Sequence, residues 1–359
     1  MKFNLKQVQD KLSSFYTSGR YDTNNYFVRY QNKKVFLARL NNDDKLLYTE
    51  TSPILGLDLG EQSFQLSYAT FMKLKNKDAE IIKDTLKCSK VLIDLDIDTK
   101  DVELPDYYCV KTNIILNYDD FVDIYNKVRP FSAGYETNNV LGTIHFSTNE
   151  DKTLDVVATD GSRLALLTKV NNLISDNVSN YMLQTCDLKK LSKVLKTYKE
   201  GTVKLARLDD YTIIIITIGD DSYPIRSAGG QYPRYKTLIP LANKITYNVN
   251  ANQLIEALNE IAPFTNERTR LVTIRFDHGW LTCHDDNGKM VKVEYDKAFE
   301  QQGDEYINDL CFNLDFILQA VKSFEPKLPL TFEGNGGLSP WLLKQGNHIH
   351  LLMPVQTKN

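Results

Sequence analysis

The chain has 359 residues, of which 42% are hydrophobic and 25% are charged, and its formal net charge is −3. This composition is ordinary for a globular protein, and the length suits two or three domains. The longest apolar run, Ile213 to Ile216, predicts a buried strand and is far shorter than the roughly 20 residues of a membrane-spanning helix. The acidic total excludes a globally basic nucleic-acid binder, although a local basic face is compatible with it.

The five cysteines are scattered and never spaced as Cys-x-x-Cys; they are Cys88, Cys109, Cys186, Cys283 and Cys311. This pattern predicts a reducing compartment with neither a disulfide framework nor a cysteine metal site. No N-terminal stretch has a signal-peptide pattern, so a cytoplasmic protein is expected. Cys283 and His284 are adjacent, and neighbouring strand residues point to opposite faces, so the pair is not expected to share a metal. We expect no metal and no cofactor.

In chain order, the first predicted helix covers residues 3–15, with Leu5, Val8, Leu12 and Phe15 on one apolar stripe. The same strand-then-helix plan recurs at residues 116–131 and 249–264, and both later copies close on a Pro-Phe pair. The stripes of these two helices are Phe121, Ile124 or Tyr125, Val128, Leu254, Leu258 and Ile261. A second helix is expected in each copy, at residues 68–77, 188–199 and 314–324.

Tight turns follow the first helix of each copy. Asp160-Gly161 and Asn287-Gly288 predict two-residue hairpin turns, because these residues tolerate positive φ. The first copy has a weaker polar turn within residues 36–50. The repeated order of elements predicts an α+β fold of three tandem domains of about 120 residues each. The expected domains are residues 1–113, 114–242 and 243–359.

Positive charge gathers on the predicted second helices. The middle copy has Lys189, Lys190, Lys193, Lys196 and Lys199 opposite its leucine stripe, and the first copy has Lys73, Lys75 and Lys77. Two interpretations stay open: a solvated helix face, or a surface that meets a polyanion through phosphate contacts. No base-reading motif is present, so any bound nucleic acid is expected to be held by its backbone.

Catalytic motifs are missing from the sequence: there is no phosphate-binding glycine loop, no Gly-x-Ser-x-Gly and no His-Glu-x-x-His. His348 and His350 alternate, so they are expected on one face of a strand as satisfied surface or core histidines. An enzyme that uses Asp160 and Arg163 on a polyanion is one alternative, but no second catalytic group lies near the hairpin.

Four motifs together resemble the bacterial DNA polymerase III beta sliding clamp family. They are VVATDGSRLAL (156–166), YPRYKTLIP (232–240), FNLDFILQAV (312–321) and LLMPVQT (351–357), in that family's order and spacing. The resemblance covers residues 115–359 well, whereas the first copy matches only in its plan and its opening Met-Lys-Phe.

The resemblance implies a homodimeric ring of six similar domains, with helices lining the hole and antiparallel sheets outside. Double-stranded DNA would pass through without base-specific contact. The ring would have no catalytic activity; it would tether a replicative DNA polymerase and raise its processivity. An ATP-driven clamp loader and repair proteins would be further partners, and no membrane is involved. A second alternative is a clamp-like peptide-binding protein that no longer closes a ring.

The resemblance also implies a cleft between the second and third domains that binds partner peptides. The matching residues are Val140, Thr159, Gly161, Ser162, Arg163, Leu164, Pro233, Thr237, Leu238, Asn313, Phe316, Leu338, Pro340, Leu351, Leu352, Met353, Pro354 and Val355. Apolar members would take hydrophobic anchors, and hydroxyl and amide groups would fix the peptide backbone. Three positions depart from the family's usual residues. Ser162 replaces a histidine, Thr237 replaces a basic or bulky residue, and Gln356 replaces an arginine.

DNA contacts and a dimer contact are expected elsewhere in the chain. The candidate DNA-binding residues are Arg20, Lys73, Lys189, Lys193 and Lys196. The resemblance also implies a dimer contact at Phe264, with Leu95 or Ile97 opposite it in the second protomer.

Overall fold

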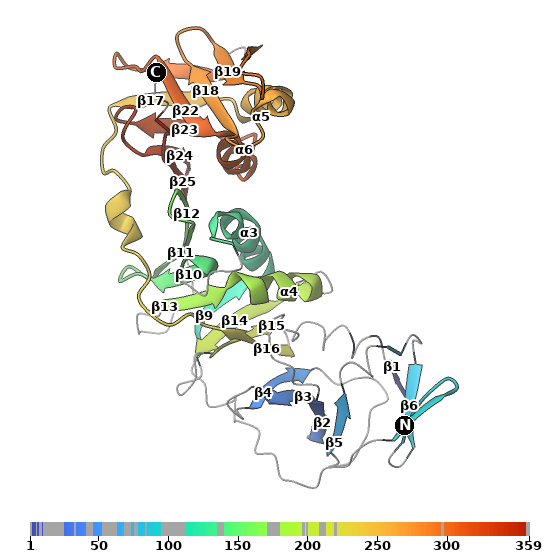
Figure 1. Ribbon diagram of the computed structural model, residues 1–359. Coiled ribbons are helices and arrows are strands. Elements are labelled where there is room, and N and C mark those ends of the chain that lie inside the picture. The colour runs from blue at the N-terminus through green and yellow to red at the C-terminus, as the bar shows by residue number, and fades with distance from the viewer. Residues whose placement is uncertain are drawn as a thin grey trace. The chain divides into compact units, whose positions relative to one another are not determined.

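The structure is a computed structural model, and Figure 1 shows it as a ribbon. It describes residues 2–4, 6, 9, 25–31, 34–40, 46–51, 63–67, 73–74, 78–82, 85–94, 112–134, 140–170, 180–195, 198, 200–207, 213–218, 221–295 and 298–356. The chain forms two compact units. The first comprises Met1–Val122 and Asn171–Gly229, and the second comprises Asp123–Val170 and Gly230–Asn359.

The first unit contains three four-stranded sheets whose orders are β1-β6-β7-β8, β4-β3-β2-β5 and β16-β15-β14-β9. Their strands are β1 (Lys2–Asn4), β2 (Asn25–Gln31), β3 (Lys34–Leu40), β4 (Leu46–Thr51), β5 (Ser63–Ser67), β6 (Asp78–Ile82), β7 (Thr85–Cys88), β8 (Val91–Asp94), β9 (Thr112–Asn117), β14 (Thr202–Arg207), β15 (Ile213–Ile218) and β16 (Asp221–Arg226). The predicted buried strand is confirmed in β15, where Ile214 and Ile216 are fully buried. Helix α4 (Thr185–Leu195) packs against β13 (Asn180–Gln184) and β16.

The second unit contains a long antiparallel sheet that runs β10-β11-β12-β25-β24-β23-β17-β21, and a smaller sheet ordered β20-β19-β18-β22. Their strands are β10 (Thr143–Thr148), β11 (Thr153–Thr159), β12 (Arg163–Val170), β17 (Ile245–Val249), β18 (Leu271–Arg275), β19 (Trp280–His284), β20 (Met290–Glu294), β21 (Phe299–Gln302), β22 (Asp309–Asn313), β23 (Leu330–Gly334), β24 (Trp341–Gln345) and β25 (His348–Leu352). Helices α5 (Ala251–Ile261) and α6 (Leu314–Lys322) pack against each other (Figure 1). Because β12 pairs with β25, strands from the second and third predicted domains share one sheet.

The order of elements repeats between the second and third predicted domains. From β9 onward it is strand, helix α3 (Tyr118–Val128), strands β10 to β13, helix α4 and three strands. From β17 onward it is strand, helix α5, strands β18 to β22, helix α6 and three strands. The repeat predicted from the sequence is therefore present in these two copies. The division at residues 113 and 242 stays a prediction.

The predicted apolar stripes face the core. Phe121, Ile124 and Val128 of α3 are buried, as are Leu254, Leu258 and Ile261 of α5. Asn250 and Asn313 cap α5 and α6, since their side chains accept hydrogen bonds from the backbone amides of Gln253 and Phe316. Among the residues that the structure describes, every helix is too short or too polar to span a lipid bilayer.

The two turns predicted as two-residue hairpins are longer. Strands β11 and β12 stop pairing at Thr159 and Leu164, which leaves residues 160–163 between them. Strands β19 and β20 stop at His284 and Met290, which leaves residues 285–289. The prediction of a two-residue turn is wrong at both sites, because an aspartate side chain caps the loop amides in each. The glycines keep their expected role, with φ of 94° at Gly161 and 76° at Gly288.

Several predicted elements lie outside the described residues: most of the helix over 3–15, nearly all of the helix over 68–77, and the end of the helix over 188–199.

Candidate functional site

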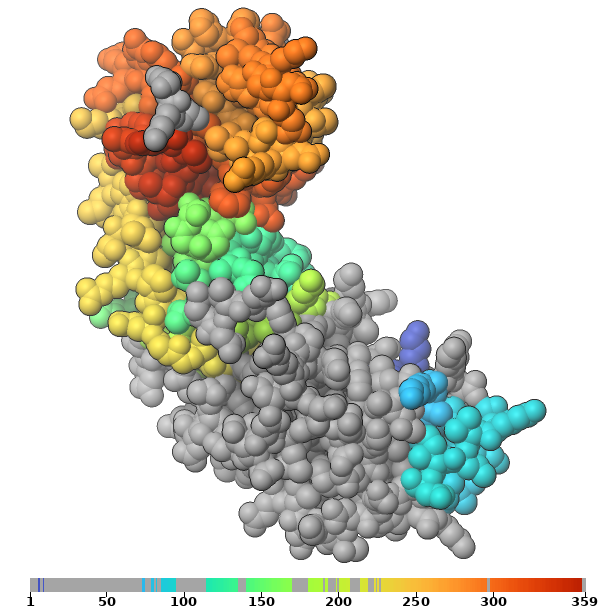
Figure 2. All heavy atoms as spheres, in the orientation of Figure 1, coloured from blue at the N-terminus to red at the C-terminus, as the bar shows by residue number. Residues whose placement is uncertain are grey.

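A cavity of about 640 Å³ opens in the second unit beside the first turn of α6. Its lining residues are Gly161, Ser162, Thr269, Leu271, Asn313, Phe316, Met353, Pro354 and Val355. None of these side chains is ionisable, and most are apolar. A cavity of this size and lining suits an uncharged side chain of a partner better than a charged one. Figure 2 shows the surface of this unit, where the green residues around the hairpin meet the red C-terminal segment.

The β11–β12 loop forms one wall of the cavity, and its own side chains hold it rigid. Asp160 Oδ1 accepts hydrogen bonds from the amides of Ser162, at 2.9 Å, and Arg163, at 3.1 Å. Thr159 Oγ1 donates to the carbonyl of Arg163 at 2.6 Å and accepts from the amide of Gly161 at 3.1 Å. The aspartate that the motif suggested as a catalytic group is therefore a cap for the turn.

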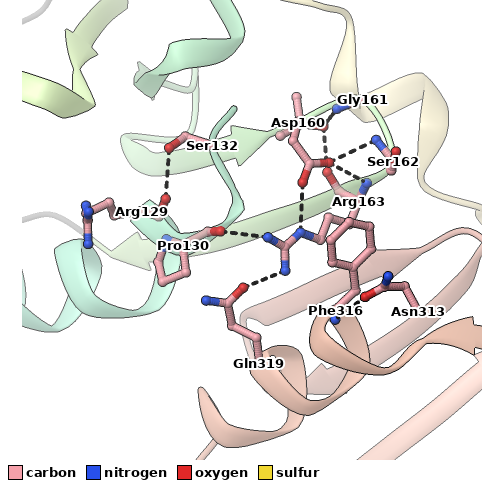
Figure 3. A network of polar contacts seen from close by, with 11 residues as sticks. Arg129, Pro130, Ser132, Asp160, Gly161, Ser162, Arg163, Asn313, Phe316 and Gln319 are labelled. Carbon is pink, nitrogen blue, oxygen red and sulfur yellow. Dashed lines mark hydrogen bonds and ion pairs between the residues drawn. The ribbon is translucent and has the colours of Figure 1, made fainter. Parts of the chain in front are cut away.

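Arg163 connects this loop to two other elements (Figure 3). Its Nε donates to Asp160 Oδ2 at 2.9 Å, Nη1 donates to Gln319 Oε1 at 2.6 Å, and Nη2 donates to the carbonyl of Pro130 at 2.9 Å. The guanidinium carbon also lies 4.1 Å from the ring centre of Phe316 and 4.8 Å from that of Phe131. Cation–π contacts at these distances stabilise a charge that is only 9% exposed.

The opposite wall is held by Arg270, which lies between the lining residues Thr269 and Leu271. Its Nε and Nη2 donate to the two carboxylate oxygens of Asp315, at 3.0 and 2.8 Å. The same guanidinium donates to the carbonyl of Ala262. Hydrogen bonds from Arg270 hold the pKa of Asp315 below its usual value. This bidentate pair fixes the wall to the first turn of α6.

The C-terminal segment completes the cavity. The amide of Val355 donates to the carbonyl of Cys311 at 2.7 Å, which holds residues 353–355 against β22. Strand β25, just before this segment, is fixed by its pairing with both β12 and β24. Most of the lining residues thus lie in loops, and hydrogen bonds, strand pairing and the capped helix α6 hold these loops in place.

Polar contacts fasten the segment 231–240 to the sheet. Asp155, only 4% exposed, accepts hydrogen bonds from Tyr235 Oη at 2.9 Å and Thr168 Oγ1 at 2.7 Å. Lys236 Nζ lies 3.1 Å from the same carboxylate. Burial raises the pKa of Asp155, but its hydrogen bonds outweigh this and the pKa is lowered overall. Burial and the neighbouring Asp155 carboxylate raise the pKa of Tyr235 well above its usual value.

The structure brings together only part of the predicted peptide-binding set. Lining residues among it are Gly161, Ser162, Asn313, Phe316, Met353, Pro354 and Val355. Thr159, Arg163, Leu164, Leu351 and Leu352 are buried, and Val140 and Pro233 are half-buried. Thr237, Leu238 and Leu338 are exposed, and Pro340 is half-buried; none of them lines this cavity.

Two lining residues, Thr269 and Leu271, are absent from the set predicted from the sequence motifs. No motif marks them, but Leu271 pairs with Asn313 across β18 and β22. The pairing of these two strands is the signal that would have identified Leu271, and Thr269 lies two residues before it.

The remaining predicted residues have different outcomes. Lys73 and Lys189 are exposed, Lys193 lies on α4, and Phe264 is 51% exposed just after α5. Arg20, Lys196, Leu95 and Ile97 lie outside the described residues.

His348 and His350 lie on the same face of β25, as predicted, with ring centres 4.5 Å apart. Both are buried, and His350 also stacks on Phe131 at 4.1 Å. His350 Nε2 lies 2.6 Å from Ser323 Oγ, whereas His348 Nε2 and His350 Nδ1 are buried without a hydrogen-bond partner. Burial lowers the pKa of His348 to about 3 and that of His350 well below 6.5. Within the described part of the chain, no group of three or more metal-ligating side chains occurs.

Comparison with known proteins identifies relatives of one kind. The beta sliding clamp of Chlamydia muridarum is 23% identical over 213 residues, which are 59% of this chain and 56% of the relative. That of Borreliella burgdorferi is 24% identical over 257 residues, 67% of this chain and 62% of the relative. The chain thus spans less than two thirds of the length of each of these relatives. No protein-family model matches the chain.

Solved structures extend the likeness in fold to nearly the whole chain. The DNA polymerase III subunit beta of Pseudomonas aeruginosa superposes with a TM-score of 0.80 at 16% identity, over 99% of both chains. The beta subunit from the DNA polymerase of Streptococcus pyogenes gives a TM-score of 0.79 at 18% identity, over 99% of both chains. The resemblance to the bacterial beta sliding clamps that the four motifs predicted is therefore confirmed, by sequence over about half to two thirds of the chain and by fold over almost all of it.

Proposed function

We propose that this chain is a DNA sliding clamp, a processivity factor that encircles duplex DNA and holds the replicative polymerase on it. The observation that carries the proposal is the uncharged cavity beside α6. Its walls come from three of the four segments that carry the resemblance, 156–166, 312–321 and 351–357. The likeness in fold over 99% of the chain supports the same conclusion.

The cavity is the proposed docking site for short peptides of the polymerase, the clamp loader and repair proteins. Deleting residues 353–359 removes one of its walls, so a polymerase-derived peptide is expected to lose measurable binding in a fluorescence titration. The milder variant Met353→Asp places a charge in the cavity and is expected to weaken binding at least about tenfold, since an unpaired charge is costly to bury. Unchanged affinity in both variants would refute the assignment of the cavity.

DNA is proposed to contact the chain through backbone phosphates alone. Support comes from the exposed Lys189 on α4 and from Lys73, which is also exposed. Helix α5 contributes no basic residue, and its exposed charges are Glu256 and Glu260, so the lysines are not spread evenly over the helices. Replacing Lys189, Lys193 and Lys196 with glutamate should shorten retention on circular DNA, most strongly at low salt. Retention that does not change across salt concentrations would count against phosphate contact.

Ring closure is proposed to occur by pairing of two copies. Among the described strands of its sheet, β8 is at the edge, and it exposes Val91 (48%) and Leu92 (65%). Strand β20 is at the edge of another sheet and exposes Met290 (51%), and the nearby Phe264 is equally exposed. Exposed apolar edge strands are ready to pair with another chain.

If β8 of each copy pairs with β20 of the other, two copies form a closed head-to-tail dimer. Light scattering on the purified protein should therefore give twice the mass of the chain, and Leu92→Lys should reduce it to a monomer that still binds peptide. A wild-type monomer would favour the alternative, a clamp-like peptide-binding protein that does not close a ring.

The proposed clamp has no catalytic role of its own and works in the cytoplasm, where a loader would open it onto DNA. Its contribution to synthesis is effective concentration: a polymerase tethered to an encircling ring rebinds the same primer end.

A further inference from the structure

Two arginines border the cavity without lining it. Arg163 follows the lining residue Ser162, and Arg270 lies between Thr269 and Leu271. Each therefore belongs to one wall, yet neither is among the residues that line the cavity. What these two side chains do instead follows from their partners.

Arg163 ties the hairpin wall to α6. It bonds to Asp160 of its own loop, to Pro130 and to Gln319, and it stacks on Phe316, whose ring lines the cavity (Figure 3). With every guanidinium nitrogen bonded inside the protein, a partner carboxylate could reach it only by breaking these contacts. Losing Arg163 would free the ring of Phe316 and detach the hairpin from the helix.

Arg270 ties the opposite wall to the first turn of the same helix. Besides its bidentate bond to Asp315, it donates to Ala262 and to Thr265 Oγ1. Its backbone has a φ of 51°, a conformation that residues other than glycine seldom adopt. The carbonyl of Arg270 also accepts the amide of Leu314, the first residue of α6, at 2.7 Å. Backbone and side chain together hold Thr269 and Leu271 in place.

We propose that Arg163 and Arg270 are positioning residues, which preform the cavity from behind its walls without binding the occupant themselves. This inference rests on the proposed function, because the occupant is taken to be a partner peptide. Each guanidinium is paired with a carboxylate, Arg163 with Asp160 and Arg270 with Asp315. The surface that remains for the occupant is uncharged.

Without these arginines, the free protein would populate the binding-competent arrangement of the walls only part of the time, which weakens the apparent affinity. If a variant holds the walls in the competent arrangement only a tenth of the time, the apparent Kd rises about tenfold. Such a loss lowers the association rate constant, whereas the loss of a direct contact raises the dissociation rate constant.

The probe is a hexapeptide selected from a random displayed library on the wild-type protein and counter-selected on Met353→Asp. Arg270→Met and Asp315→Asn should each weaken its binding about tenfold, chiefly through slower association. The double variant should be no weaker than either single one, because both substitutions break the same tie.

Arg275→Met is the matched control. It removes an arginine–aspartate pair with Asp309 at the other end of β18 and β22, away from the cavity. Its affinity for the hexapeptide should stay within about twofold of wild type, because an exposed ion pair contributes little free energy. An equal loss in Arg275→Met, or additive losses in the double variant, would overturn the positioning role of Arg270.

Arg163 is tested against the reading that it binds the peptide directly. Gln319→Met removes one hydrogen bond of Arg163, and Arg163→Lys changes the geometry of the others. Each variant is measured with the selected peptide and with a copy that carries one added aspartate. Within each variant, both peptides should lose affinity by the same factor. A larger loss for the acidic copy would show a direct contact with a carboxylate and sink the proposal. Failure to select any Met353-dependent peptide would instead contradict the proposed function, so the two failures are distinguishable.

Discussion

Lowering the pH from 7 to 5 is expected to destabilise the second unit strongly, because three histidines are buried there in the neutral form. They are His145, His348 and His350, whose exposed fractions are 7%, 5% and 0%. Burial lowers the pKa of His145 to about 4 and that of His348 to about 3, and lowers the pKa of His350 well below its ordinary 6.5. In the unfolded chain each imidazole returns to that ordinary value.

The sign follows from proton uptake on unfolding. Above pH 6.5 both states hold neutral imidazoles, so the full stability is present. As the pH falls below 6.5, the imidazoles bind protons in the unfolded chain but stay neutral in the folded chain. The free energy of unfolding therefore decreases until the pH reaches the folded-state pKa values. Each group costs about 1.4 kcal/mol per pH unit in this window, so three groups give a slope of about 4 kcal/mol per unit and a loss of roughly 6 kcal/mol at pH 5. This is comparable to the whole stability of many domains.

The charged groups around the histidine pair do not reverse this expectation. Lys127 and Lys169 oppose a positive charge on His348, whereas Asp123 favours one, and burial outweighs all three. For His350 the neighbouring His348, Arg163 and Lys127 all oppose protonation. The pKa values of Asp155 and Glu333 are lowered, so these carboxylates stay ionised over the pH range in which the histidine effect on stability is measured.

Urea unfolding followed by tryptophan fluorescence measures this directly. The chain has two tryptophans, and the fully buried Trp341 lies on β24, which pairs with the strand that carries His348 and His350. The free energy of unfolding is to be compared at pH 7.5, 6.5, 5.5 and 5. Replacing both strand histidines with leucine should remove about two thirds of the slope.

His278→Gln provides the control for that series, because its imidazole is 61% exposed. Its slope should match wild type. A wild-type free energy that stays flat between pH 6.5 and 5 would mean that the three imidazoles are hydrated or protonated in the folded protein, and the reasoning from burial would fail.

Two further substitutions test the packing and the polar contacts. A Cβ atom at Gly334 would lie 2.4 Å from ring atoms of Trp341, so Gly334→Ala should lose about 1–3 kcal/mol of stability or more in the same urea assay; Gly337→Ala, whose nearest neighbour is 4.0 Å away, should change little, and equal stabilities would show that the ring moves freely. Asp155→Asn removes the charge that holds segment 231–240 and should cost about 1–3 kcal/mol, whereas the exposed Asp151→Asn should cost little; a neutral Asp155→Asn would contradict the role given to this buried carboxylate.

Local patterns predicted the elements well and their connections less well. Helical periodicity identified α3 and α5 with their buried faces, because a short run of consecutive residues is enough to show an amphipathic stripe. The hairpin at Asp160-Gly161 was placed correctly but its length was wrong, since the loop is set by a side chain that caps two amides. Whether an aspartate caps its own loop depends on a rotamer that spacing does not reveal.

The site was predictable as far as motifs reach. Gly161, Phe316 and Met353 were expected and line the cavity. Arg163 was expected as a docking surface, yet the structure buries it, because its partners Pro130 and Gln319 are distant in sequence. Leu271 was missed because only the pairing of β18 with β22 brings it opposite Asn313.

The pairing of β12 with β25 has a consequence for how the protein folds. Leu167 lies beside His348 in this ladder, so the two strands meet only after most of the second unit's chain has been brought together. Contacts between residues so distant in sequence carry a large loop-closure cost and slow folding. The cavity depends on this ladder, since Ser162 and Met353 immediately flank it. We therefore expect the cavity to be among the last features to form during refolding, after the local hairpins and helices of both copies are in place.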